Sequence, residues 1–457
     1  MRYDKLRRVL AGALAAALLA VPALAAEETA PQLPDAWAVG ELADSYALGL
    51  VDDAYTSYIQ DPVTAEQLEA MTEIVAAKLA LLELPQREAD TAGLVVDTTR
   101  GGVMDALYQE AAAYELPGVE EGPEAFLAGL GVVKGDQAGA LALDRPCTYQ
   151  EAMVMADRLI LAVYDGQDAG SKGLLWKAVN GENTLYLLGT IHMDRSNVYP
   201  LHKSLRDAID AAQVVSFELD LNDQEGLALF AQLQTYSDGT TLADHISHAL
   251  YERVQAAAEG LGMGPDGLDT YKPWALASTF GVLSLQDETT GANAMAIDMY
   301  VNARAVNSGK TIDAVETYAF QGGIFDGLSA AYQETYLETN LAAYEAMLNG
   351  EEADEEALEL AQAQQEMMEG MFQAWKARDP EGFQKVYDKE AIIHSDDELN
   401  AKLFTERDPG MIQAAARYLE QEGENTVLLA VGAGHMVDPG GIVSGLREMG
   451  YTVELVP

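Results

Sequence analysis

The chain has 457 residues and is 49% hydrophobic, enough for two or three domains with a sizeable apolar core. Its formal charge of −47 at pH 7 excludes nucleic acid as a partner, because no basic stretch offsets the acidic side chains. The single cysteine, Cys147, excludes an intramolecular disulfide, so the core and any bound metal must stabilise the fold.

The first 25 residues predict a cleaved signal peptide. Four basic residues precede an Ala/Leu-rich run from Val9, and Ala23-Leu-Ala25 forms a small-x-small cleavage site. The run is too short and too rich in alanine to span a membrane comfortably, and no other stretch approaches that length. We therefore expect a secreted protein, with a polar tether at 26–34 and no transmembrane segment in the mature chain.

Residues 35–165 predict a mainly helical region that repeats weakly. Helices that end at glycine are expected over 37–51 and 125–135, and threonines precede three further helices, at Thr64, Thr99 and Thr148. The pattern resembles degenerate S-layer homology modules, which attach exported proteins to cell-wall polysaccharide.

In those modules a threonine is followed by arginine, and here only Thr99-Arg100 keeps that pair. A cationic side chain is the natural partner of an anionic polymer, so the loss of arginine after Thr64 and Thr148 weakens the prediction of polymer binding. The alternative is a helical spacer that binds no ligand.

A glycine-rich linker at 166–172 separates this region from a second domain at 174–457. The second domain opens with a predicted β-hairpin, and a long helix is expected over 242–260. Four further apolar strands are predicted, at 214–219, 311–315, 427–432 and 452–456. Strands alternating with helices predict an α/β (α+β) fold whose mixed sheet is covered by helices.

Four of the predicted strands end in a polar or glycine-led group: Gly189-x-x-His192, Glu218, Glu316 and Gly432-x-x-His435. Loops at the carboxyl ends of such strands form the ligand crevice of α/β sheets. Two imidazoles with one or two carboxylates suit a first-row metal ion, and glycine lets the backbone approach it closely. From the pattern alone, histidines that merely hydrogen-bond within their loops are an equal alternative.

Several segments together carry a specific resemblance over 174–457, in the right order. They are Gly189-Thr-Ile-His192, Ser216-Phe-Glu-Leu-Asp220, Thr241-Leu-Ala-Asp244, Lys272-Pro-Trp274, Val315-Glu-Thr317 with Gln321, Glu406-Arg407-Asp408 and Val431-Gly-Ala-Gly-His435. This set resembles the TraB/GumN family, which includes the Tiki metalloproteases. The family usually has Arg-Asn where this chain has Arg407-Asp408.

The resemblance implies that His192 and His435 are metal ligands and that Glu218 is the family's glutamate, with Glu316 in reserve. One divalent ion per chain is expected, Mn, Co or Zn, with Mn or Co favoured by the resemblance. The ion would activate water and polarise a carbonyl, with Glu218 as ligand or general base. Arg407 would hold an oxyanion or a substrate carboxylate, or else form a structural ion pair.

The remaining histidines are weaker candidates. Asp244, His245 and His248 have helical spacing that would suit chelation but are expected on a helix surface, and His202 is expected to cap a helix.

The sequence thus predicts an exported metal-dependent peptidase-like hydrolase that acts on extracellular peptides or proteins and attaches to anionic wall polysaccharide. A protein that binds and sequesters peptides without cutting them is one alternative, and a plain cell-wall adhesion protein is another.

Overall fold

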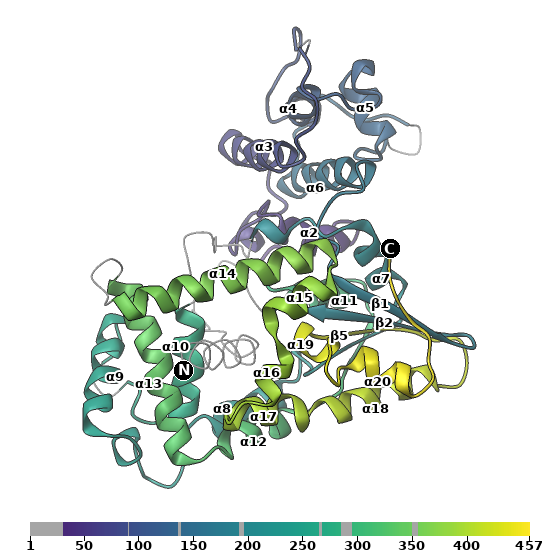
Figure 1. Ribbon diagram of the computed structural model, residues 1–457. Coiled ribbons are helices and arrows are strands. Elements are labelled where there is room, and N and C mark those ends of the chain that lie inside the picture. Colours follow the sequence, from purple (N-terminus) through teal and green to yellow (C-terminus); the bar gives the residue numbers. More distant parts are fainter. Residues whose placement is uncertain are drawn as a thin grey trace.

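The computed structural model describes residues 31–89, 91–135, 139–191, 196–264, 267–284, 295–349 and 355–457 (Figure 1). The expected signal peptide, the first part of the tether and His192 lie outside the described residues. Within the described parts, no helix is both long and apolar enough to cross a membrane.

A six-stranded mixed sheet organises the second half of the chain, in the order β4-β3-β5-β2-β1-β6. Its strands are β1 (Leu174–Asn180), β2 (Asn183–Thr190), β3 (Val214–Phe217), β4 (Thr311–Ala314), β5 (Thr426–Gly432) and β6 (Val453–Leu455). β1 pairs antiparallel with β2 and β6, whereas β2, β5, β3 and β4 are parallel to one another. The predicted mixed sheet is confirmed, and its four parallel strands end at one edge.

The first two strands form the predicted hairpin. Asn180 pairs with Asn183 across a two-residue turn, and Gly181 has a φ of +60°, a conformation that glycine adopts without strain. The apolar run of β5 is buried along its length, as expected for a strand covered on both faces.

Two pairs of helices cover the sheet, one on each side (Figure 1). α7 (Lys203–Ala211) and α11 (Ile297–Asn307) contact each other and the β3–β5 part of the sheet. α18 (Asp408–Leu419) and α20 (Ile442–Glu448) contact each other and its β1–β2–β6 part. The other helices of this half are α8 (Gln224–Leu233), α9 (His248–Gly260), α10 (Pro273–Leu283), α12 (Tyr318–Asp326), α13 (Ala330–Asn349), α14 (Glu355–Ala377), α15 (Pro380–Tyr387), α16 (Lys389–Ile393), α17 (Glu398–Thr405) and α19 (Ala433–Met436).

The first half of the chain is mainly helical, as predicted, and α3 to α6 stand apart from the sheet (Figure 1). Its helices are α2 (Leu42–Ala47), α3 (Ala65–Ala80), α4 (Arg100–Ala112), α5 (Pro123–Gly129) and α6 (Tyr149–Gly166). Thr64, Thr99 and Thr148 each occupy the N-cap position expected for them. The Thr64 and Thr99 hydroxyls accept hydrogen bonds from backbone N–H groups of their helices at 3.2 and 3.1 Å.

Three predicted helices differ from the structure. The helix expected over 125–135 is α5 (Pro123–Gly129), and the chain leaves the helix before Gly131, whose φ is +74°. The helix expected over 37–51 is an α-helix only at Leu42–Ala47, because the chain turns at Gly49 (φ +83°) and Leu50 N donates to Ser45 O. The helix expected over 242–260 is interrupted: a 3₁₀ turn, η6 (Leu242–Asp244), precedes α9. Asp244 Oδ2 accepts from Thr241 N at 2.8 Å and so closes the short turn before α9 begins.

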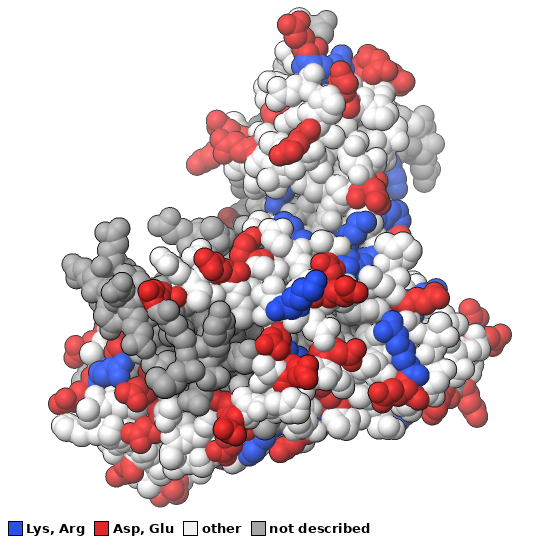
Figure 2. All heavy atoms as spheres, in the orientation of Figure 1, with Lys and Arg blue, Asp and Glu red and all other residues white. Residues whose placement is uncertain are grey.

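Buried polar contacts join the helical region to the sheet half. Tyr300 on α11 donates its hydroxyl to Asp44 Oδ1 at 2.6 Å, and Arg304 forms an ion pair with the same carboxylate. Lys78 Nζ on α3 donates to Tyr199 O at 2.9 Å. Figure 2 shows acidic side chains over most of the visible face, with basic side chains gathered near this junction.

Candidate active site

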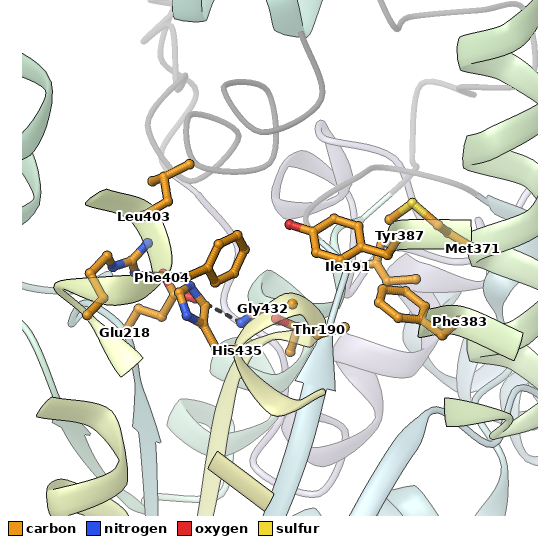
Figure 3. Close-up of a pocket in the computed structure, with 13 residues that line it drawn as sticks. Thr190, Ile191, Glu218, Met371, Phe383, Tyr387, Leu403, Phe404, Gly432 and His435 are labelled. Carbon is orange, nitrogen blue, oxygen red and sulfur yellow. Dashed lines mark hydrogen bonds and ion pairs between the residues drawn. The ribbon is translucent and has the colours of Figure 1, made fainter. Parts of the chain in front are cut away.

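A pocket of about 40 Å³ lies at the carboxyl edge of the parallel strands (Figure 3). The ends of β2 and β5 form its floor, while α14, α15, α17 and α19 supply most of its walls. Its lining residues are Thr190, Ile191, Glu218, Met371, Phe383, Tyr387, Leu403, Phe404, Arg407, Gly432, Ala433, Gly434 and His435. Three of the five residues that the sequence singled out therefore line one pocket.

Two carboxylates come together through the pairing of β3 with β4. Phe217 lies opposite Ala314, and just beyond these strands Glu316 N donates to Glu218 O at 2.9 Å. Both carboxylate side chains are almost fully buried, at 7% and 6% exposed. Burial of two like charges requires a cation between them.

Arg407 supplies that cation. Its Nη2 donates to Glu218 Oε2 at 2.5 Å and to Glu316 Oε2 at 2.8 Å, and its Nε donates to Glu316 Oε1 at 3.0 Å. Burial alone would lower the pKa of Arg407, but the charges of Glu218 and Glu316 outweigh it and raise the pKa above its ordinary value. Of the two roles expected for Arg407, these contacts fit the ion pair.

Glu218 has a second anchor on the opposite side of its carboxylate. Gly432 N, at the end of β5, donates to Glu218 Oε1 at 2.8 Å, and Gln321 Nε2 donates to Oε2 at 3.3 Å. Together with Arg407 these donors fix the orientation of the Glu218 carboxylate. Its Oε1 atom lies 3.9 Å from Nε2 of His435.

His435 lies in α19, a single helical turn that follows β5 directly. Its Nδ1 lies 2.6 Å from Oδ1 of Asp408, the first residue of α18. A carboxylate only accepts, so Nδ1–H donates in this contact, and Nε2 is the ring nitrogen on the side of Glu218. A carboxylate that orients the far nitrogen of a histidine is the usual support of a metal-binding imidazole.

The glycines of both Gly-x-x-His segments serve close packing around this turn. A Cβ on Gly189 would lie 3.1 Å from Cα of Ala433, and one on Gly434 would lie 2.9 Å from the ring and hydroxyl of Tyr387. The sequence predicted that glycine would allow close approach here. In the structure, α19 lies close to Gly189 and the ring of Tyr387 lies close to Gly434.

Three side chains of this site were not expected from the sequence. Asp408 stands out there only as a neighbour of Arg407. Lys389, whose Nζ donates to Asp408 Oδ2 at 2.8 Å, does not stand out at all. Tyr387 lines the pocket with its hydroxyl directed toward the side that carries Phe404 and His435 (Figure 3). Burial, reinforced by the charge of Asp408, raises the pKa of Tyr387, so the hydroxyl stays a proton donor.

The donor atoms suit a divalent metal in kind. Among the described residues no group of three or more His, Cys, Asp or Glu side chains is arranged to hold an ion. His435 Nε2 and Glu218 Oε1 are 3.9 Å apart. Because this is less than twice a metal–ligand distance of about 2.1 Å, one ion could contact both atoms. His192, the third expected ligand, follows Ile191 directly in the chain, and Ile191 lines the pocket.

The other histidines with described positions serve elsewhere. His202 is the N-cap of α7, where its Nδ1 accepts from Ser204 N at 3.1 Å. His245 stacks on Tyr236 with ring centroids 4.2 Å apart, in the break before α9, so it does not share a helical face with His248.

Comparisons with known proteins match the sheet half of the chain to one family. Residues 174–455 match the model of the TraB/PrgY/gumN family. The chain is 22% identical over 318 residues to metalloprotease TIKI1 of Danio rerio, covering 62% of this chain and 63% of that protein. It is 23% identical over 302 residues to metalloprotease TIKI2 of Danio rerio, covering 60% and 58%.

The chain thus spans less than two thirds of the length of these relatives, and no solved structure matches it. The family match extends over well more than half of the residues and includes every side chain of the pocket. This chain belongs to the TraB/PrgY/gumN family.

Proposed function

We propose that this protein is an exported metal-dependent peptidase of the Tiki type that acts on extracellular peptides or proteins. The observation that carries the proposal is the pair of atoms His435 Nε2 and Glu218 Oε1, 3.9 Å apart, each oriented by a buried partner on its far side. The two relatives from Danio rerio are named metalloproteases, which supports the reaction class.

In this proposal His435, Glu218 and His192 hold one Mn, Co or Zn ion, with Glu316 supporting Glu218 through Arg407. Such an ion supplies Lewis acidity, which lowers the pKa of water and polarises a peptide carbonyl. In this proposal Glu218 is a ligand, because its donors hold the carboxylate in one orientation with Oε1 toward His435.

The remaining side chains of the pocket shape the reaction. Arg407 neutralises the two carboxylates and keeps them in place, so its guanidinium is not needed as a substrate contact. Tyr387 would donate its hydroxyl hydrogen to the oxygen that becomes negative when the carbonyl is attacked. The apolar wall of Met371, Phe383 and Phe404 lowers the local dielectric and strengthens these interactions.

The test is metal content followed by cleavage. Mature protein is incubated with Mn²⁺, Co²⁺ and Zn²⁺, freed of unbound ions, and analysed by elemental mass spectrometry beside His435→Ala. His248→Ala, whose side chain is 85% exposed, is the matched control. We expect about one ion in the wild type and in His248→Ala, none in His435→Ala, and peptide cleavage that follows the ion.

Other results would change the assignment. An ion without cleavage, but with peptide binding that survives chelation, would favour the sequestering protein. Folded wild type that binds no ion would contradict the metal site and leave the histidines structural.

A second function, attachment to an anionic wall polysaccharide, is supported by a different pocket. This pocket, of about 490 Å³, lies in the helical region and has four basic side chains and one acidic one among its lining, Arg100, Lys134, Arg145, Arg158 and Glu151. Trp37, 47% exposed, also lines it. Glu151 pairs with Arg100 and Arg145, and Glu41 pairs with Arg158, so these side chains together keep a small net positive charge. A net positive hollow in so acidic a chain suits an anionic sugar polymer, and the ring of Trp37 provides apolar contact.

Binding to purified wall polymer tests this function. Lys134→Ala with Arg145→Ala should weaken co-sedimentation at low salt, because both side chains lie toward solvent and can be removed without opening the core. Lys177→Ala, on the exposed face of β1, is the control. Equal binding by all three proteins would leave the region a spacer.

A further inference from the structure

Lys389, the first residue of α16, is the least expected charge near the pocket. Its side chain is 0% exposed, its Nζ donates to Asp408 Oδ2 at 2.8 Å and to Val437 O at 3.0 Å, and it lies 4.8 Å from the centre of the Phe404 ring. A fully buried ammonium group costs free energy even when paired, so its position suggests a task beyond stability.

The other oxygen of Asp408 shows what that task is. Asp408 Oδ2 faces Lys389 while Oδ1 faces His435 Nδ1 at 2.6 Å, so the carboxylate joins α16 to α19. With Lys389 holding one oxygen, the carboxylate cannot turn away from the imidazole. Its other contact fixes both the plane of the His435 ring and the nitrogen that carries the proton.

We infer that Lys389 is a positioning residue that acts through Asp408 to hold the His435 ring with Nδ1–H donating to Asp408 and Nε2 directed toward Glu218. The inference deepens the proposed function, since Nε2 on the side of Glu218 is the atom that His435 would offer to a metal ion. The orientation of His435 in the metal-free protein can be tested whether or not the proposed function is correct.

The alternative is that Lys389 only neutralises Asp408 and stabilises the fold. The two roles separate in the substitutions Lys389→Met, Asp408→Asn and the double variant. In Lys389→Met the carboxylate loses the contact that aims it. In the double variant the contact between position 408 and His435 can persist, because an amide oxygen accepts from Nδ1–H and an amide needs no counter-charge. Lys385→Met, an exposed lysine four residues earlier, is the matched control.

The first measurement uses metal-free protein carrying ¹⁵N-histidine, with His435→Ala assigning the signals. Two-bond correlations to the ring nitrogens, near neutral pH, report which nitrogen is protonated. We expect a single Nδ1–H tautomer for His435 in the wild type and Lys385→Met, a mixture or the Nε2–H form in Lys389→Met, and a return to Nδ1–H in the double variant.

The second measurement is titration calorimetry with Mn²⁺ and Zn²⁺. Loss of an outer-shell partner costs about 10- to 100-fold in metal affinity, and we expect that loss in Lys389→Met with most of it recovered in the double variant. A role limited to neutralising Asp408 predicts a loss of stability in Lys389→Met that the double variant recovers, but an unchanged His435 tautomer and an unchanged metal affinity in the folded protein.

Folded Lys389→Met with the wild-type tautomer would overturn the inference. If Lys389→Met does not fold, Asp408→Asn decides: Lys389 should hold the amide oxygen and leave the amide NH2 facing Nδ1, which favours the Nε2–H tautomer, and retention of Nδ1–H would contradict the inference. A wild type that binds no ion but shows the expected tautomer change would contradict the proposed function and leave the inference standing.

Discussion

Glu218 and Glu316 are 98 positions apart in the chain, yet the backbone N–H of Glu316 donates to the backbone carbonyl of Glu218 at 2.9 Å. Parallel pairing of β3 with β4 places the two carboxylates side by side at the sheet edge, and Arg407 from the start of α18 lies between them. The three side chains form one buried ion cluster with one positive and two negative charges. The positive charge is therefore essential to the cluster.

Removing Arg407 should accordingly be severe. Arg407→Met removes the cation that two buried carboxylates share, and breaking a buried ion pair costs about 3–5 kcal/mol of the free energy of unfolding. Urea denaturation, compared with Arg417→Met on the exposed side of the same helix, measures the loss. A cost below about 1 kcal/mol would show that Glu218 and Glu316 are not jointly held by this side chain.

Gly434 packs tightly against Tyr387, so a larger residue at this position should disturb the site. In Gly434→Ala the new methyl group would lie 2.9 Å from the Tyr387 ring, so the ring or α19 must move, at about 1–3 kcal/mol. The movement would also shift His435, the next residue, and should lower metal affinity.

Gly410→Ala in α18 is the opposite case, because nothing lies within 4 Å of the added carbon. A glycine-to-alanine change inside a helix should stabilise by about 0.5–1 kcal/mol. Chemical denaturation of the two variants should give opposite signs. Equal signs would mean that Tyr387 does not pack tightly on Gly434.

The strands and the site edge could be predicted from the sequence because short-range patterns determine them. Apolar runs bounded by turn residues gave the hairpin of β1 with β2 and the strand before Gly432, and each parallel strand places its last residue at the same edge. From this, Glu218, Glu316 and His435 were expected close together.

Asp408, Lys389 and Tyr387 could not be predicted in this way. They come from the starts and ends of α15, α16 and α18, and only the packing of these helices over the sheet brings them to α19. Nothing in local periodicity marks a lysine as buried, since lysine is an ordinary residue of a solvent-facing helix. The break before α9 was missed for a similar reason: a side-chain contact of Asp244, not a change of pattern, ends the turn.

Tyr387→Phe tests the hydroxyl that faces the pocket. The ring keeps its packing against Gly434, so stability and metal content should be unchanged, while the proposed peptide cleavage should fall about 100-fold in kcat with the loss of one donor to the oxyanion. Tyr451→Phe, a partly exposed tyrosine just beyond α20, is the control. Unchanged kcat in Tyr387→Phe would remove the hydroxyl from the mechanism.

Lys78 gives a pH dependence at the junction with the helical region. Burial, with a smaller contribution from Lys376, lowers the pKa of Lys78 to about 8. The unfolded chain keeps its ordinary pKa, so between about pH 8 and 10 the unfolded state binds more protons and stability rises with pH. In Lys78→Met this rise should be smaller, whereas Lys134→Met should behave as wild type. Parallel curves for all three proteins would contradict the assignment.

Asp157 on α6 gives a pH dependence of stability with the opposite sign. It is fully buried, neither carboxyl oxygen has a hydrogen-bond partner among the described residues, and it faces charged side chains of four elements: Glu41, Asp44, Arg206 and Arg304. Burial, then the negative charges of Asp44 and Glu41, raises the pKa of Asp157 well above its ordinary value despite the two arginines.

The folded state therefore holds a proton that the unfolded state releases, so this residue's contribution to stability falls as pH rises above the unfolded pKa of about 4. Asp157→Asn cannot lose a proton, and its advantage over the wild type should be small near pH 4 and grow toward neutral pH. Thermal unfolding at several pH values measures it, with the exposed Asp396→Asn as control. An advantage that shrinks with rising pH would mean that Asp157 is ionised in the folded protein and stabilised there by Arg206 and Arg304.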